Sequence, residues 1–204
     1  MIAAEPDVNG LFDALSTTDD DTAARLHARL VEAARQAGVL DVAYRTHDTP
    51  VGPLLLAATE AGLVKVAFAS QDFDAVLRML ATRVSPRVLR APGRLDEASR
   101  QLDEYFGGRR TVFDLPLDLR LATGFRRAVL THLPRIGYGR TESYAQVAAA
   151  AGSPKAVRAV GTACALNPLP LVVPCHRVVR SDGSVGGYAG GPEVKEHLLR
   201  MEAT

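Results

Sequence analysis

A cysteine followed directly by a histidine and an arginine is the feature of this 204-residue chain with the most obvious chemistry. Cys175 follows the apolar run 169–173 and Pro174, and His176 and Arg177 come next. A free thiol has a pKa of about 8.5, so only a small fraction is thiolate at neutral pH. An adjacent imidazole or guanidinium can raise that fraction. The motif predicts an activated nucleophile at the edge of the fold, within reach of a substrate; the common alternative is a buried cysteine that only fills space.

The same segment sets a geometric condition for that chemistry. The run 169–173 predicts a short strand that stops at Pro174. In a regular strand, Cys175 and His176 would point to opposite faces. If the imidazole serves the thiol, the chain must leave strand geometry here, or a water molecule must link the two groups.

The composition is that of an ordinary globular protein, with 47% hydrophobic and 23% charged residues. The sequence contains neither an apolar run long enough to cross a membrane nor a secretory signal pattern. Its two cysteines, Cys164 and Cys175, form no CxxC pair and no Cys/His metal-ligand spacing. We therefore expect a cytoplasmic protein without a metal site, a cofactor or a membrane partner.

Charge is distributed unevenly along the chain, although the formal net charge is only +1. Residues 1–40 carry −4, residues 41–120 carry 0 and residues 121–204 carry +5. The basic part contains Cys175, which favours an anionic partner such as nucleic acid. A charge fluctuation along a solvated surface is the alternative.

The hydrophobic pattern divides the chain into three parts. Residues 1–40 predict an acidic helical extension whose helix is capped by Asp19–Asp21. Residues 41–120 alternate apolar and polar positions, which predicts an antiparallel meander. Helices at about 73–82 and 96–106 would cover one face of this meander.

Residues 121–204 are predicted to be mainly helical. Thr123 is expected to cap one helix, Thr141-Glu142-Ser143-Tyr144 to start a second and Ser153-Pro154 to start a third, and a last helix is expected to span about 193–202. The second and third of these are separated by a tight Gly152-Ser153 turn, which is the outline of a helix-turn-helix.

The third helix, at about 154–166, has little bulk on one face. Its predicted core face comprises Val157, Val160, Gly161 and Cys164, and its small-residue face comprises Ala156, Ala159 and Ala163 beside Arg158. Small side chains let a helix approach the narrow minor groove of DNA. The alternative is that alanine simply favours helix.

Several spaced motifs together resemble the O6-alkylguanine-DNA alkyltransferases. The matching segments are Ser143-Tyr144, 154–161, Asn167-Pro168, 174–178, 187–191 and 195–199. The resemblance is dense over 121–202, weaker over 41–120 and absent from 1–40. It implies an α+β fold, in which a small ribonuclease-H-like strand–helix domain at 41–120 precedes a winged-helix-like catalytic domain at 121–204.

The resemblance implies repair of DNA by a protein that acts once. The second helix of the helix-turn-helix would bind the minor groove, and the damaged guanine would be flipped out of the duplex. Cys175 would then take the alkyl group irreversibly from O6-alkylguanine, and also from O4-alkylthymine. The implied partner is duplex DNA containing O6-alkylguanine, bound by a monomer whose binding to DNA can be cooperative.

The resemblance also assigns roles to individual residues. Cys175 is the nucleophile, and His176, linked through water and paired with Glu202, activates it. Tyr144 hydrogen-bonds a ring nitrogen of the base and assists its departure. The finger that fills the vacated space is Arg158.

Further positions are implied to contact DNA or the base. The DNA-binding set comprises Arg158, Ala156, Ala159, Gly161, Lys155 and Ser143, and the base pocket comprises Val178, Tyr188, Ala189 and the hinge residue Asn167. Ala189 stands where several relatives carry serine, which could change the preferred alkyl size.

Two other functions are compatible with parts of the pattern. A thiol hydrolase could use Cys175, His176 and Glu202, and would turn over. A helix-turn-helix regulator or alkylation sensor would bind DNA without a primary repair role, although the alanine-rich helix lacks side chains that distinguish base edges.

Overall fold

The computed structural model describes residues 20–203, which belong to two compact units that meet between Leu40 and Asp41. In the first unit, α2 (Asp20–Gln36) is followed by Gly38 in the left-handed region, with φ of 64°. This ending agrees with the predicted helix. The predicted cap at Asp19 lies outside the described residues.

The second unit begins with a sheet. Strands β1 (Val42–His47), β2 (Leu54–Thr59) and β3 (Gly62–Phe68) form the predicted antiparallel meander. A short strand, β4 (Val88–Arg90), pairs with β1 in parallel and gives the order β3-β2-β1-β4. Strand β4 was not predicted, because a strand of three residues is too short to show an alternating pattern.

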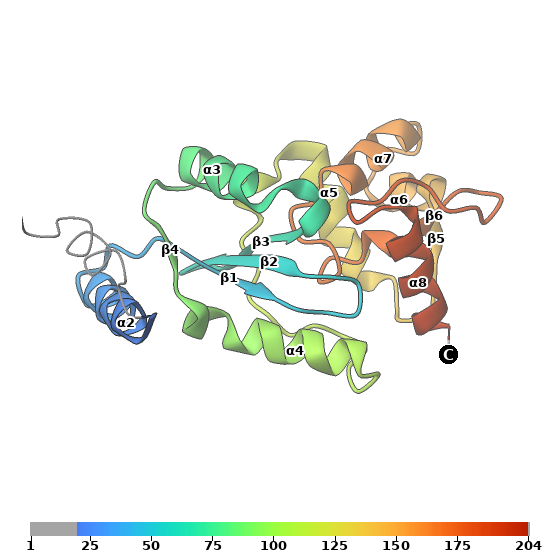
Figure 1. The fold of residues 1–204 in the computed structure, drawn as a ribbon. Coiled ribbons are helices and arrows are strands. Elements are labelled where there is room, and N and C mark those ends of the chain that lie inside the picture. The colour runs from blue at the N-terminus through green and yellow to red at the C-terminus, as the bar shows by residue number, and fades with distance from the viewer. Residues whose placement is uncertain (1–19, 204) are drawn as a thin grey trace, which may run out of the picture. The chain divides into compact units, whose positions relative to one another are not determined.

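Two helices pack on opposite faces of this sheet, as Figure 1 shows. The apolar cluster on one face joins Leu54 and Leu56 to Leu102 of α4 (Asp96–Phe106). The cluster on the other face joins Leu55 to Leu80 of α3 (Phe73–Arg83). The prediction that both helices cover one face is therefore wrong. Every residue of β2 is buried, so the sheet needs cover on both sides.

The connection after α4 runs along β3. The N–H of Leu63 donates to the carbonyl of Pro116, and the N–H of Asp118 donates to the carbonyl of Leu63, each at 2.8 Å. Gly62 has a φ of 132°, and a Cβ there would lie 2.2 Å from the Pro116 oxygen. Only glycine permits this close approach.

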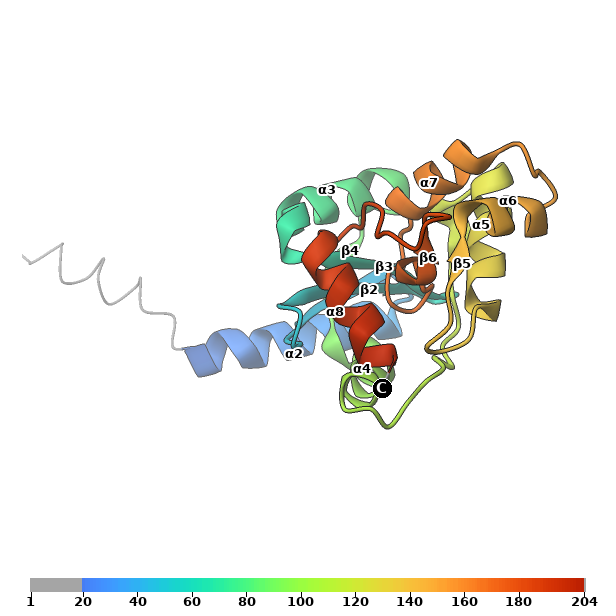
Figure 2. The same ribbon diagram turned by 90° about the vertical axis from the view of Figure 1, so that its right-hand side faces the viewer.

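The rest of the second unit is mainly helical. Helices α5 (Gly124–His132), α6 (Tyr144–Ala150) and α7 (Val157–Ala165) pack against one another, and α8 (Pro192–Glu202) closes the chain (Figure 2). Two short strands, β5 (Glu142–Ser143) and β6 (Val178–Val179), pair in parallel. One apolar core includes Leu54, Leu102, Leu130 and Leu198, so it continues on both sides of residue 120.

The start of α7 differs from the prediction. The helix begins at Val157 rather than Pro154, because residues 153–156 form a separate turn in which the Ala156 N–H donates to the Ser153 carbonyl at 2.8 Å. Val157 is 38% exposed and Ala163 only 1%, which reverses their predicted faces. The buried side comprises Val160, Ala163 and Cys164, the positions that share one face of a helix.

The mixed α+β architecture agrees with the predicted fold class. Within residues 20–203, no helix has the length and apolar character needed to cross a membrane. No group of three or more His, Cys, Asp or Glu side chains in the same part of the chain is arranged to hold a metal ion.

Candidate active site

The apolar segment before the cysteine is a buried turn and not the predicted strand. The Val173 N–H donates to the Leu169 carbonyl at 2.8 Å, and Leu171 has a positive φ of 74°. Prolines 168, 170 and 174 have no N–H to give to a strand partner. The chain therefore leaves strand geometry before it reaches Cys175.

Asn167 holds both ends of this turn. Its Oδ1 accepts from the Leu169 N–H at 3.0 Å, and its Nδ2 donates to the Val173 carbonyl at 2.8 Å. The same Nδ2 lies 3.1 Å from Cys175 Sγ. The amide predicted to act at a hinge is thus placed against the thiol.

Cys175 is buried rather than at the edge of the fold, with 1% of its surface exposed. It begins a 3-10 turn over Cys175–Arg177. Burial raises the pKa of its thiol to about 11, an effect that the Asn167 hydrogen bond and the charge of Lys195 offset only in part. At neutral pH the resting site therefore holds a neutral thiol.

His176 forms a fully buried pair with Glu202, with Nε2 2.9 Å from Oε1. Burial alone would raise the pKa of Glu202, but hydrogen bonds from His176 and Arg177 lower it to about 2. Burial lowers the pKa of His176, which favours the neutral imidazole. With a charged carboxylate at Nε2, that nitrogen carries the proton, and Nδ1 is left as a buried acceptor without a hydrogen-bond partner among the described residues.

The Glu202 carboxylate accepts hydrogen bonds from other residues besides His176. Arg177 donates to both of its oxygens at 2.8 Å and, through Nη1, to the Ile136 carbonyl at 2.6 Å. Tyr105 Oη donates to Oε1 at 2.7 Å. Arg177 was predicted only as a neighbour of the thiol, and Tyr105, which is 97 residues distant from Glu202, was not predicted.

Tyr144, the first residue of α6, lies in the same region. A Cβ on Gly186 would be 2.3 Å from its hydroxyl oxygen, so the tyrosine rests against the Gly186 backbone. Burial raises the pKa of Tyr144, which keeps the hydroxyl protonated as a donor. Lys195, fully buried, lies 5.9 Å from the centre of the Tyr144 ring and donates to the Val178 carbonyl at 2.5 Å. Lys195 was not predicted to be a site residue.

Tyr188 and Ala189 lie next to each other in the loop before α8, and both are partly buried. The Tyr188 ring meets the His176 ring edge-on at 6.2 Å, and the ring of Phe68 at 5.6 Å. Phe68 ends β3, so the sheet supports the aromatic ring that is predicted to cover the pocket.

The residues predicted to contact DNA lie mostly on the surface. Arg158, Ala159 and Lys155 are exposed, and Ala156 and Gly161 are partly exposed. The Ser143 hydroxyl accepts from the Gln146 N–H at 3.2 Å and so caps α6. The fold therefore separates an exposed helix-turn-helix surface from the buried thiol.

Two family models match this chain. The DNA binding domain of 6-O-methylguanine DNA methyltransferase matches residues 124–204, and the ribonuclease-like domain of the same family matches residues 42–119. The chain belongs to this family. The predicted family, enzyme class and fold class are confirmed at that level.

Curated relatives and solved structures agree. The constitutive methylated-DNA–protein-cysteine methyltransferase of Bacillus subtilis is 42% identical over 160 residues, covering 78% of this chain and 94% of the relative. The Mycobacterium bovis protein of the same name is 41% identical over 159 residues, covering 78% and 91%. The crystal structure of O6-methylguanine methyltransferase from Mycobacterium tuberculosis has a TM-score of 0.70 at 40% identity, covering 79% of this chain and 93% of that one. A structure of M. tuberculosis OGT in complex with DNA has the same score and identity, covering 79% and 92%.

Proposed function

We propose that this methyltransferase repairs duplex DNA by moving an alkyl group from O6 of guanine to Sγ of Cys175, once per molecule. The observation that carries the proposal is the buried thiol preceding a His176–Glu202 pair whose second imidazole nitrogen has no partner in the described chain. Membership in the 6-O-methylguanine DNA methyltransferase family supports the same chemistry.

The transfer begins with loss of the thiol proton. His176 Nδ1 accepts this proton through a water molecule, and the Glu202 carboxylate stabilises the imidazolium that forms. The thiolate sulfur then attacks the alkyl carbon, the carbon–sulfur bond forms and the carbon–O6 bond breaks. The electron pair of the broken bond stays on guanine.

Tyr144 and Lys195 would serve the departing base. The Tyr144 hydroxyl, kept protonated by burial, donates to a ring nitrogen and relieves the negative charge on guanine. Lys195 holds the Val178 carbonyl, one of the backbone groups proposed to contact the base edge. Asn167 holds the turn and places its amide on Sγ.

Because Cys175 is buried, the base must leave the duplex to reach it. Flipping a nucleotide costs a few kcal/mol of stacking and pairing. We propose that the exposed Arg158, with Ala156, Ala159, Gly161, Lys155 and Ser143 around it, binds the minor groove and fills the vacated space. O4-alkylthymine is proposed as a second substrate, and a monomer as the acting form.

The same site argues against a thiol hydrolase. A hydrolase would have to release the group bound to Cys175, but the thioether formed by alkyl transfer has no activated leaving group. A regulator that only binds DNA would not require a neutral thiol beside a paired imidazole.

The number of transfers per molecule tests the proposal. A duplex carrying one O6-methylguanine is added in tenfold excess, and restored guanine is counted against protein. We expect restoration to stop at one equivalent. Continued turnover would instead support the hydrolase, and no restoration would support the DNA-binding regulator.

A further inference from the structure

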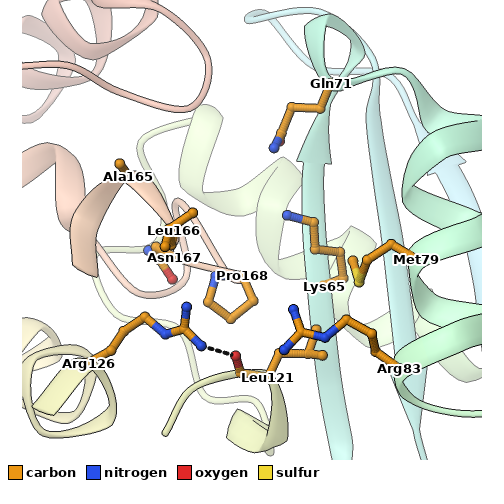
Figure 3. Close-up of a pocket in the computed structure, with 10 residues that line it drawn as sticks. All are labelled: Lys65, Gln71, Met79, Arg83, Leu121, Arg126, Ala165, Leu166, Asn167 and Pro168. Carbon is orange, nitrogen blue, oxygen red and sulfur yellow. Dashed lines mark hydrogen bonds between the residues drawn. The ribbon is translucent and has the colours of Figure 1, made fainter. Parts of the chain in front are cut away.

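A cavity of about 180 Å³ lies between β3, α3 and the turn at Asn167–Pro168 (Figure 3). Its size is several times the ~30 Å³ that one water occupies in the liquid. The proposed alkyl transfer uses no group in its walls except Asn167. The other polar side chains that line the cavity belong to Lys65, Gln71, Arg83 and Arg126.

Lys65 is the most unusual of these side chains. It lies in β3 and is only 8% exposed, and Figure 3 shows its ammonium group directed into the cavity. This ammonium group forms no hydrogen bond or ion pair with any residue of the described chain. Burial lowers the pKa of Lys65, and no carboxylate contributes an opposing effect. A cationic group that faces a cavity and has no carboxylate beside it can bind an anionic ligand there.

The other polar residues that line the cavity contribute hydrogen-bond donors and no negatively charged group. Arg126 donates to the Leu121 carbonyl at 2.5 Å, while its Nε is buried without an acceptor in the described chain. Arg83 extends across the cavity from α3 (Figure 3). The Oε1 of Gln71 accepts from the Phe68 N–H at 3.1 Å, which leaves its NH₂ group as a donor. No Asp or Glu of residues 20–203 lines this cavity.

We propose that this cavity binds a phosphate group, supplied either by a small phosphate compound or by the backbone of bound DNA. Two guanidinium groups and one ammonium match the charge and the several acceptor oxygens of a phosphate. A neutral ligand would leave Lys65 unpaired. The site borders Asn167, whose amide contacts Cys175 Sγ, so its ligand lies next to the turn that carries the thiol.

The small-ligand source is tested by thermal unfolding of the full chain. Sodium phosphate is titrated against sodium chloride of equal ionic strength. We expect a saturable rise of the unfolding midpoint, about 5 °C at a hundredfold excess over Kd. Lys65→Met and Arg83→Met should remove this rise. Arg78→Met changes an exposed arginine of the same helix that does not line the cavity, so it should keep the rise.

The DNA source is tested by the salt dependence of binding to an undamaged duplex. If a backbone phosphate occupies the cavity, Lys65→Met weakens binding, and the slope of log K against log salt becomes shallower by about 0.9. If the occupant is a small phosphate compound, this slope is unchanged and only the thermal response is lost.

Arg83→Met keeps the test decisive if Lys65→Met fails to fold, because Arg83 is exposed. The proposal is overturned if phosphate gives no more stabilisation than chloride and the DNA slope of the variants equals that of the wild type. It is also overturned if both cavity variants keep the full phosphate response. Neither result depends on Cys175, so failure here leaves the proposed alkyl transfer untouched.

Discussion

Glu202, two residues from the end of the chain, pairs with both residues that follow Cys175. The residue is 3% exposed, and its carboxylate accepts hydrogen bonds from His176, Arg177 and Tyr105. A glutamate at a helix end is ordinarily solvated and free to fray. Here it fixes the imidazole tautomer and neutralises a buried guanidinium, and nothing in the local sequence distinguishes it from a surface residue.

Glu202→Gln should change how stability depends on pH. The folded-state pKa of about 2 lies below the ordinary 4.5, so the carboxylate contributes stability above pH 4.5 that is lost as the pH falls toward 2. This contribution is about 3 kcal/mol. Denaturant unfolding at several pH values between 3 and 7 should show a steeper acid loss in the wild type than in the variant. Parallel curves would mean that Glu202 is not held as a charged group.

Residue types identified the candidate groups of the site but did not predict their surroundings. The Cys175-His176 pair and Tyr144 were identified from the motifs, and the structure places them in one region. The burial of Cys175 was not predicted, because burial results from packing between segments distant in the chain. Lys195 and Tyr105 were missed as site residues for the same reason.

At the scale of elements, prediction succeeded where local signals are strong. Helix α4 ends at a Gly-Gly pair and α6 begins with a reciprocal Ser143–Gln146 cap, so both were placed within a residue or two. The run 169–173 was misjudged because apolar composition alone does not separate a strand from a buried turn. The prolines at 168, 170 and 174 and the Asn167 side chain decide the outcome.

A mutation in the helix-turn-helix should impair extrusion of the base without impairing alkyl transfer at the thiol. Arg158→Ala should slow transfer from an alkylated duplex by about 100-fold, because a few kcal/mol of flipping would go uncompensated. Transfer from free O6-alkylguanine, which needs no flipping, should stay close to the wild-type rate. Rates on the two substrates can be compared in single-turnover experiments. Equal losses on both would contradict a role in extrusion.

At the scale of the whole molecule, charge differs between the two units. Residues 1–40 carry a formal −4, whereas 121–204 carry +5. Residues from both matched family domains, 42–119 and 124–204, contribute to one apolar core. The two domains therefore pack against each other within residues 41–204.

Deleting residues 1–40 should strengthen binding to undamaged DNA severalfold at low salt, because an acidic segment that competes with phosphate is removed. The gain should shrink toward 1 M salt, where the screening length falls to about 3 Å. Binding measured across a salt series checks this. A deletion that lowers stability and leaves affinity unchanged would show that the segment acts through packing.

In the proposed function, Cys175 is a reagent that is consumed by one alkyl group. The most direct test incubates the protein with duplex DNA containing O6-methylguanine, digests it and measures peptide masses. We expect one added methyl on the peptide with Cys175, none on the peptide with Cys164, and none on a Cys175→Ser variant that still binds the duplex. An unmodified Cys175 beside repaired guanine, or a methyl group on Cys164, would contradict it.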